Sequence, residues 1–180
     1  MDLFAENELM TLGRAYMNTA RLQLRPPAQS DIPHLAEILN DFRISGWLGN
    51  VPYPYGRKDA EQFIVTNEKN SGQVWMIHDT AGLIGMVGTV GELGYWLAPR
   101  AWKHDYASEA AQAATQAYFA APDAHDLRAG YFTGNTRSAS VLHRLGFEHV
   151  QTNRKYCRAR GEHLLHEAML LTHDRWATRH

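Results

Sequence analysis

The run from Glu92 to Ala110 constrains the fold more than any other part of the chain. It has the sequence ELGYWLAPRAWKHDYASEA. Its first six residues are aromatic and aliphatic, as in a strand, and Pro99 ends that strand because proline has no amide hydrogen. An alanine-rich helix then begins, with small residues at helical spacing. These are Ala107, Ala110, Ala111, Ala114 and Ala117. We therefore predict a strand that turns abruptly into a helix packed close against a sheet.

The start of this helix is a candidate site for a phosphate group. The first amides of a helix have no hydrogen-bond partner within it, and the positive end of the helix dipole lies behind them. Phosphates bind at such helix starts in many proteins. Local physics alone thus favours a phosphate-bearing ligand here.

Two blocks of sequence resemble the GNAT acetyltransferase superfamily in its RimJ/RimL-like branch. The first block is similar to the acyl-CoA motif GYWL-P-x-x-W-G-x-G-Y-A-x-E-A. The second, NTRSASVLHRLGF from Asn135 to Phe147, is similar to N-x-x-S-x-x-x-L-x-x-L-G-F. Their order and separation make the signal specific. The resemblance spans about residues 19–172. It implies an α/β (α+β) fold: a mixed, mostly antiparallel sheet with a splayed parallel strand pair and helices on both faces.

The resemblance also implies an enzyme, an acetyl-CoA-dependent N-acetyltransferase. The acceptor would be a primary amine, such as a protein N-terminal amine. In that family a strand amide at the position of Leu97 polarises the thioester carbonyl. The expected acetyl-CoA-binding residues are Trp96, Leu97, Arg100, Lys103, His104, Asp105, Tyr106, Ala107 and Asn135.

One departure from the family pattern concerns the phosphate loop. The pattern has glycine where this chain has Lys103 and Asp105. Lys103 adds a cation beside a phosphate, whereas Asp105 stands at the N-cap position, where aspartate caps well. One interpretation is a coenzyme site that tolerates an unusual loop. The alternative is a helix capped by its own carboxylate, in a non-catalytic or regulatory binding protein on the GNAT scaffold.

Three residues are candidates for the chemistry. Glu92 shares a strand face with the cleft residues and is the expected base, acting through a water, or else a solvated charge. Many GNAT enzymes use a tyrosine as the acid, but Leu142 occupies that place. The RimJ/RimL-like pattern offers Ser138 instead, with a local backbone contact as its structural alternative. Asn135 would bind coenzyme or cap the following helix.

The acceptor side is expected in the segment from 44 to 55, which is rich in aromatic residues, glycine and proline. The resemblance places this segment at the acceptor wall, and the expected substrate-binding residues are Trp47, Tyr53, Tyr55 and His78. A hydrophobic lid is the structural alternative for the loop, and a satisfied structural histidine is the alternative for His78. We predict no metal site, because His163-Leu-Leu-His166 lacks the glutamate of a metalloprotease motif.

Composition limits the remaining classes. The chain has 180 residues, 44% hydrophobic and 21% charged, with a formal net charge of -1. These values predict one globular domain, residues 19–180, after an N-terminal extension of residues 1–18, with no nucleic-acid or membrane partner. The single Cys157, the lack of an apolar run of about 18 residues and the lack of a secretory signal favour a cytoplasmic protein. We expect a monomer or homodimer.

The order of elements along the chain predicts how the strands of the sheet are connected. A helix connects the strand that begins at Glu92 to a strand at Leu127–Phe132, so these two strands should be parallel neighbours. The other connections have hairpin signals, at residues 79–82 and near residues 160–161. The final strands are expected at about 148–158 and 164–172.

Overall fold

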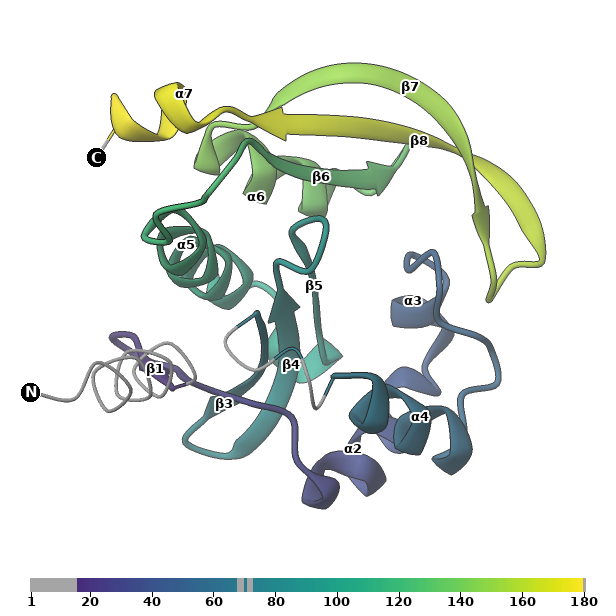
Figure 1. The fold of residues 1–180 in the computed structure, drawn as a ribbon. Coiled ribbons are helices and arrows are strands. Elements are labelled where there is room, and N and C mark those ends of the chain that lie inside the picture. The colour runs from purple at the N-terminus through teal and green to yellow at the C-terminus, as the bar shows by residue number, and fades with distance from the viewer. Residues whose placement is uncertain (1–15, 68–69, 71–72, 180) are drawn as a thin grey trace, which may run out of the picture.

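A computed structural model describes residues 16–67, 70 and 73–179. Within these residues, eight strands form two sheets (Figure 1). The first sheet is antiparallel and has the order β1 (Met17–Asn18), β2 (Gln23–Arg25), β3 (Val74–Asp79), β4 (Gly82–Gly88) and β5 (Gly94–Leu97). The second sheet, also antiparallel, has the order β6 (Leu127–Phe132), β8 (Glu162–Leu171) and β7 (Glu148–Cys157).

The helices lie between and beside these sheets. They are α2 (Ile32–Leu39), α3 (Phe42–Ser45), α4 (Arg57–Asn67), α5 (Tyr106–Phe119), α6 (Thr136–Leu145) and α7 (His173–Ala177), with short 3-10 turns at Gln29–Asp31 and Pro99–Ala101. Among the described helices, none has the length and apolar character that a bilayer span requires.

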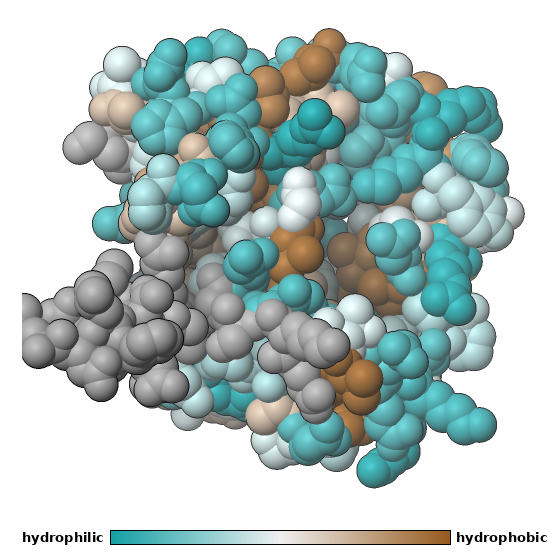
Figure 2. Space-filling view, in the orientation of Figure 1, coloured by the Kyte–Doolittle hydropathy of each residue, from teal (hydrophilic) through white to brown (hydrophobic). Residues whose placement is uncertain are grey.

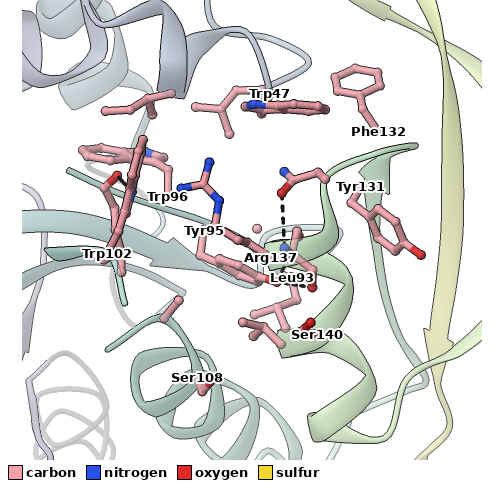
Figure 3. A pocket seen from close by; sticks show the side chains of 18 of the residues that line it. Trp47, Leu93, Tyr95, Trp96, Trp102, Ser108, Tyr131, Phe132, Arg137 and Ser140 are labelled. Atoms are coloured by element: carbon pink, nitrogen blue, oxygen red, sulfur yellow. Dashed lines mark hydrogen bonds between the residues drawn. The ribbon is translucent and has the colours of Figure 1, made fainter. Parts of the chain in front are cut away.

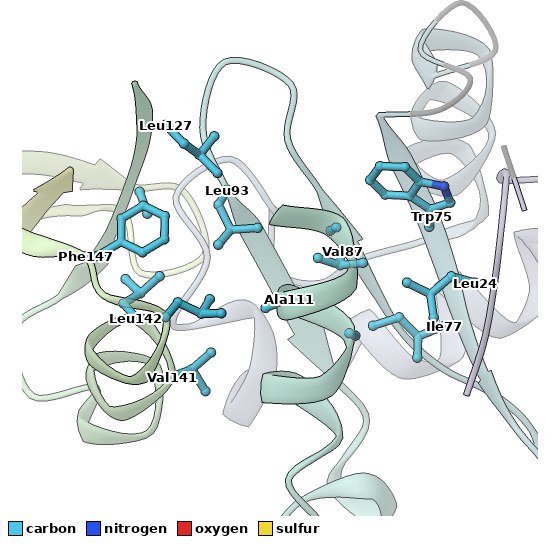
Figure 4. Close-up of a cluster of buried hydrophobic side chains, with 14 of the residues drawn as sticks. Leu24, Trp75, Ile77, Val87, Leu93, Ala111, Leu127, Val141, Leu142 and Phe147 are labelled. Atoms are coloured by element: carbon cyan, nitrogen blue, oxygen red, sulfur yellow. The ribbon is translucent and has the colours of Figure 1, made fainter. Parts of the chain in front are cut away.

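Helices cover both faces of the first sheet, as expected. Along β3 the side chains alternate, so Trp75 and Ile77 face α5 while Met76 faces α2 and α4. The alanine stripe of α5 is fully buried at Ala110, Ala111 and Ala114, which brings the helix close to the sheet (Figure 4). The same apolar cluster continues to α6 and the second sheet. One core therefore joins both sheets.

The parallel strand pair is splayed. Leu93, immediately before β5, forms an isolated parallel bridge with Ala129 of β6. Its amide donates to the carbonyl oxygen of Arg128 at 2.7 Å. Beyond this bridge β5 stays with the first sheet and β6 belongs to the second, so the two strands diverge. The expected architecture is confirmed.

The structure changes two expected boundaries. The central strand β5 begins at Gly94, and Glu92 precedes it in a bend. Met17 and Asn18, which we had placed in the N-terminal extension, pair with β2 as part of the first hairpin. The rest of the predicted extension, residues 1–15, lies outside the described residues.

Gly85→Ala tests how tightly β4 and β5 approach each other. A Cβ atom at Gly85 would lie 2.3 Å from the Trp96 carbonyl oxygen and 2.6 Å from the Leu97 Cδ2. Because backbone must move, we expect the free energy of unfolding to fall by about 1–3 kcal/mol, measured by urea denaturation.

Gly94→Ala is the matched control for that substitution. It lies on β5, and its added Cβ would meet nothing within 4 Å. We expect its unfolding free energy to stay within about 0.5 kcal/mol of the parent protein. Equal destabilisation by both substitutions would contradict close packing at Gly85.

Candidate functional site

A cavity of about 410 Å³ lies where β5 and β6 diverge. Its walls come from α3 and the loop after it, β5, the turn that leads into α5, the end of β6, and the start of α6. Figure 2 shows a hollow near the centre of the molecule, with apolar side chains inside it and polar ones around it. Figure 3 shows Trp47, Trp96 and Trp102 along one part of the wall and Tyr95 and Arg137 toward its centre.

The free edge of β5 presents backbone groups to this cavity. Successive amides of a strand point to opposite edges. The Leu93 amide bonds to β6, and the Ala98 amide bonds to the Ile84 carbonyl on the other side. The amides of Tyr95 and Leu97 therefore point to the open edge. The Leu97 carbonyl, on the same edge, accepts a hydrogen bond from the Trp102 indole at 2.8 Å.

The start of α5 opens onto the same cavity, and its N-cap side chain does not bond to the helix amides. Asp105 occupies the N-cap position in the left-handed conformation (φ 59°) without a side-chain hydrogen bond to the helix. Its exposed carboxylate pairs with Arg144 instead, at 2.9 Å. The interpretation of Asp105 as a self-capping residue is therefore wrong, because this backbone conformation turns the carboxylate away from the helix amides.

The backbone at this turn explains the glycines of the family pattern. Lys103 (φ 66°) and Asp105 (φ 59°) are the non-glycine residues with positive φ in the part of the chain that the structure describes. Glycine adopts this conformation without strain, whereas a side chain costs energy. The loop thus keeps the shape that the pattern implies, despite the two substitutions.

Several polar groups near the start of α5 were not found from the sequence. The Ser108 hydroxyl is buried in the cavity wall and has no partner among the described residues. The Arg137 guanidinium lies over the Trp102 ring, 4.1 Å from its centre, and Arg144 also lines the cavity. Arg137 could have been found, since it belongs to the same NTRS segment as Ser138. Arg144 could not, because its partner lies 39 residues away.

Ser138, at the start of α6, is held by two neighbours. The Asn135 side chain accepts from the Ser138 amide at 3.2 Å, as an N-cap does. The Tyr95 hydroxyl donates to the Ser138 carbonyl oxygen and lies 3.1 Å from the Ser138 hydroxyl. Burial raises the pKa of Tyr95 to about 12, so this phenol keeps its proton at neutral pH. Sequence reasoning missed Tyr95.

Leu142 does not reach the cavity. It is fully buried in the apolar core between α6 and the second sheet. Its place in the packing explains why an aliphatic residue suits the position where many GNAT enzymes have a tyrosine.

Glu92 and Trp47 both line the cavity. The Glu92 carboxylate is half exposed and pairs with Lys155 Nζ at 3.1 Å. Trp47 follows α3, and Arg160 from the β7–β8 turn lies 5.3 Å from its ring centre. Arg160 Nε also donates to the Gly46 carbonyl oxygen at 2.7 Å. The β7–β8 hairpin therefore fixes the loop that carries Trp47.

Five of the predicted site residues do not line the cavity. Arg100 pairs with Asp79 at 2.8 Å and bonds to carbonyl oxygens at the start of β4. His104 is exposed and stacks on Tyr106 at 5.5 Å. Tyr53 packs against Phe42, while Tyr55 is buried against α2 and α4. His78 belongs to β3, on the far side of β4 from β5.

The described residues contain no group of three or more His, Cys, Asp or Glu side chains that could hold a metal ion. The cavity instead joins unpaired backbone amides, a helix start and cations to an aromatic wall. Such a site suits an elongated ligand that carries phosphate at one end and a carbonyl group at the other.

Comparison with known proteins identifies the family. The family model of the acetyltransferase (GNAT) domain matches residues 21–148. The chain belongs to the GNAT acetyltransferase family. No curated protein matches the chain.

Solved GNAT structures share the fold. A GNAT-family acetyltransferase from Bacillus anthracis has a TM-score of 0.75 at 20% identity, covering 88% of this chain and 99% of that one. The ribosomal-protein-S5-alanine acetyltransferase from Vibrio fischeri has a TM-score of 0.74 at 21% identity, covering 89% and 98%. The spermidine N-acetyltransferase from Vibrio cholerae, in complex with CoA and spermine, has a TM-score of 0.74 at 15% identity, covering 88% and 99%.

Asp105→Asn tests the charge at the phosphate end of the cavity. The amide keeps the size and tolerates the left-handed conformation, but it removes a negative charge and releases Arg144. Because the pair is exposed and screened, we expect acetyl-CoA to bind only about two- to five-fold more tightly by calorimetry in low salt.

Asp123→Asn provides the control for Asp105→Asn, since it removes an exposed carboxylate outside the cavity. It should leave the affinity unchanged. Weaker binding in Asp105→Asn would contradict the account, because it would mean that the carboxylate supports the loop that binds the coenzyme.

Proposed function

We propose that this protein is an acetyl-CoA-dependent N-acetyltransferase of the RimJ/RimL-like branch. The observation that carries the proposal is the junction of two unpaired sets of amides, on the open edge of β5 and at the start of α5, in one cavity. Membership of the GNAT family supports the reaction type.

The coenzyme would lie across the diverging strands. The backbone of Tyr95 on the open edge of β5 would pair with the pantetheine arm, whereas the expected contact of the Trp96 backbone is ruled out because that backbone faces Met86 of β4. The phosphates would meet the amides of residues 106–108, with Lys103, Arg137 and Arg144 supplying positive charge. The Ser108 hydroxyl and the guanidinium groups of Arg137 and Arg144 are additions to the expected set. Arg100 and His104 are left out, since neither lines the cavity.

The reaction needs a polarised carbonyl, a proton for the leaving thiolate and an amine without its extra proton. The Leu97 amide would hold the developing oxyanion. Ser138 would protonate the sulfur, positioned by Asn135 and by the Tyr95 hydroxyl. Glu92 would sit at the acceptor end, where its carboxylate attracts the incoming ammonium. The remaining acceptor wall is Trp47 with its aromatic surroundings.

The acceptor we propose is a primary amine, with a peptide N-terminal amine as the first choice. Structural neighbours include an enzyme named for a ribosomal-protein alanine and one named for spermidine. Both acceptor types present a primary amine on an extended chain. A cytoplasmic location, a monomeric or homodimeric state and independence from metal, nucleic acid and membrane remain predictions.

Calorimetry with acetyl-CoA, followed by a thiol-release assay, tests the proposed function. We expect micromolar binding and acetylation of an alanine-initiated tetrapeptide, spermidine, or both. No binding at millimolar acetyl-CoA would contradict the assignment of the protein as an enzyme and favour the regulatory alternative. Binding without turnover on any primary amine would also favour that alternative.

Tyr95→Phe tests the proposed proton donor. The change removes only the hydroxyl that holds Ser138, so kcat should fall about tenfold with little effect on the affinity for acetyl-CoA. Ser138→Ala should cost at least as much. Tyr156→Phe, on the exposed side of β7, is the control and should change nothing. Full activity in Ser138→Ala would exclude this serine as the acid.

A further inference from the structure

His166 is a buried histidine in the wall of the cavity. It lies on β8, opposite Phe132 of β6, and is 7% exposed. A Cβ atom at Gly130 would lie 2.3 Å from the His166 Cε1 atom and 2.6 Å from Nε2, so the ring occupies space that only glycine leaves open. Gly130, Phe132 and His166 all line the cavity. The strand pair therefore accommodates an imidazole at the acceptor end.

The ring of His166 is held by an aromatic neighbour rather than by a hydrogen bond at Nδ1 within the described residues. Its Nδ1 atom is buried without a hydrogen bond to any residue in the described part of the chain. A buried polar atom without a partner is costly, and such atoms are common at functional sites. The contact that orients the ring is with the Phe132 ring, edge to face at 5.7 Å. Packing therefore holds the imidazole, and its Nδ1 atom is left available among the described residues.

The charges around His166 favour the neutral ring. Burial lowers the pKa of His166 below its ordinary value of 6.5, and Lys155 of β7 lowers it further. Glu92 before β5 and Glu167 of β8 act in the opposite direction and offset part of that shift. A neutral imidazole at neutral pH has a free lone pair and can accept a proton.

Glu92 is less suited to accept that proton. Its carboxylate is half exposed and already paired with the Lys155 ammonium at 3.1 Å. His166 is shielded from solvent and unpaired. We infer that His166 is the base that takes the proton from the acceptor ammonium, with Glu92 and Lys155 setting the charge around it. This inference rests on the proposed N-acetyltransferase function.

The acetyl-transfer step moves one proton to His166 and another to the coenzyme sulfur. The acceptor R–NH₃⁺ gives one proton to the imidazole, and the freed lone pair forms a bond from nitrogen to the thioester carbonyl carbon. When the C–S bond breaks, the second proton of the nitrogen ends on the sulfur by way of the Ser138 hydroxyl. The products are R–NH–CO–CH₃, CoA–SH and imidazolium, which releases its proton to solvent.

A pH profile of kcat/KM tests this role in the wild-type protein. With His166 as base, the profile rises with pH through an ionisation below 6.5, because the base is active once it is neutral, and it changes again only near the pKa of the acceptor ammonium. That rise should occur at the same pH for an alanine-initiated tetrapeptide, whose amine has a pKa of about 8, and for spermidine, whose amines are more basic. A rise that moves with the pKa of the amine would overturn the inference.

His166→Gln should remove that ionisation. With spermidine as acceptor, we expect kcat/KM at pH 7 to fall about 100-fold, and the difference from the wild-type protein to narrow by about tenfold per pH unit up to the pKa of the amine, as the amine deprotonates by itself. Acetyl-CoA affinity measured on the same sample reports whether the variant is folded. The wild-type profile decides the matter if it is not.

Two further variants separate His166 from its neighbours. His163→Gln changes an exposed histidine on the same strand and should keep the wild-type profile. Glu92→Gln should keep the rise and move it to lower pH, because Glu92 raises the pKa of His166. If Glu92→Gln abolishes the increase of kcat/KM with pH while His166→Gln retains it, Glu92 is the base that accepts the proton, and the inference is overturned. If the wild-type protein binds acetyl-CoA and acetylates amines, and His166→Gln has the same activity and pH profile, the inference is overturned. The proposed function is not affected by that result.

Discussion

One backbone hydrogen bond sets the geometry of the site. The Leu93 amide bonds to the Arg128 carbonyl oxygen, and the strands part beyond this point. Parallel strands that stayed together would bond each other along their whole length and leave no space for a ligand. Here the divergence leaves the amides of β5 unpaired at one edge. A buried amide without a partner is unfavourable, so this edge is a ready site for a ligand that supplies carbonyl groups.

The cavity has two chemical ends because different elements meet there. At one end the start of α5 and three cations suit negative charge. At the other end Trp47, which follows α3, and the aromatic rings of β6 line the cavity together with Glu92, Lys155 and His166. The β7–β8 hairpin joins these parts, since it carries Lys155 and His166 and bonds to the loop after α3 through Arg158 and Arg160. The acceptor end therefore depends on the β7–β8 hairpin, and the phosphate end depends on α5 and α6.

Much of the fold could be predicted from the sequence, because short stretches of residues determine these helices and strands. The alternation along β6, the alanine stripe of α5 and the glycine that ends α6 each lie within a short window. The splay of the two strands came from the family resemblance rather than from periodicity. No sequence pattern marked Gly130 as important. Its role, leaving space for the His166 ring, depends on the packing of β6 against β8.

Side-chain partners could not be predicted in the same way. Asp105 looked like a cap from its position, but Arg144, 39 residues away, takes its carboxylate. Arg100 is close to the phosphate loop in sequence, yet Asp79 holds it on the other side of β4. Tyr95 and Ser138 are 43 residues apart, and only the packing of α6 beside β5 brings them together. Such pairs depend on tertiary structure, which a single sequence does not display.

Amide hydrogen exchange with and without acetyl-CoA tests the central claim most directly. If the coenzyme lies across the diverging strands, it should slow exchange at Tyr95, Leu97 and residues 106–108, and leave the outer strand β7 at Val150–Asn153 unchanged. Unchanged exchange at the β5 edge and the α5 start under saturating acetyl-CoA, or protection confined to another surface, would contradict the account.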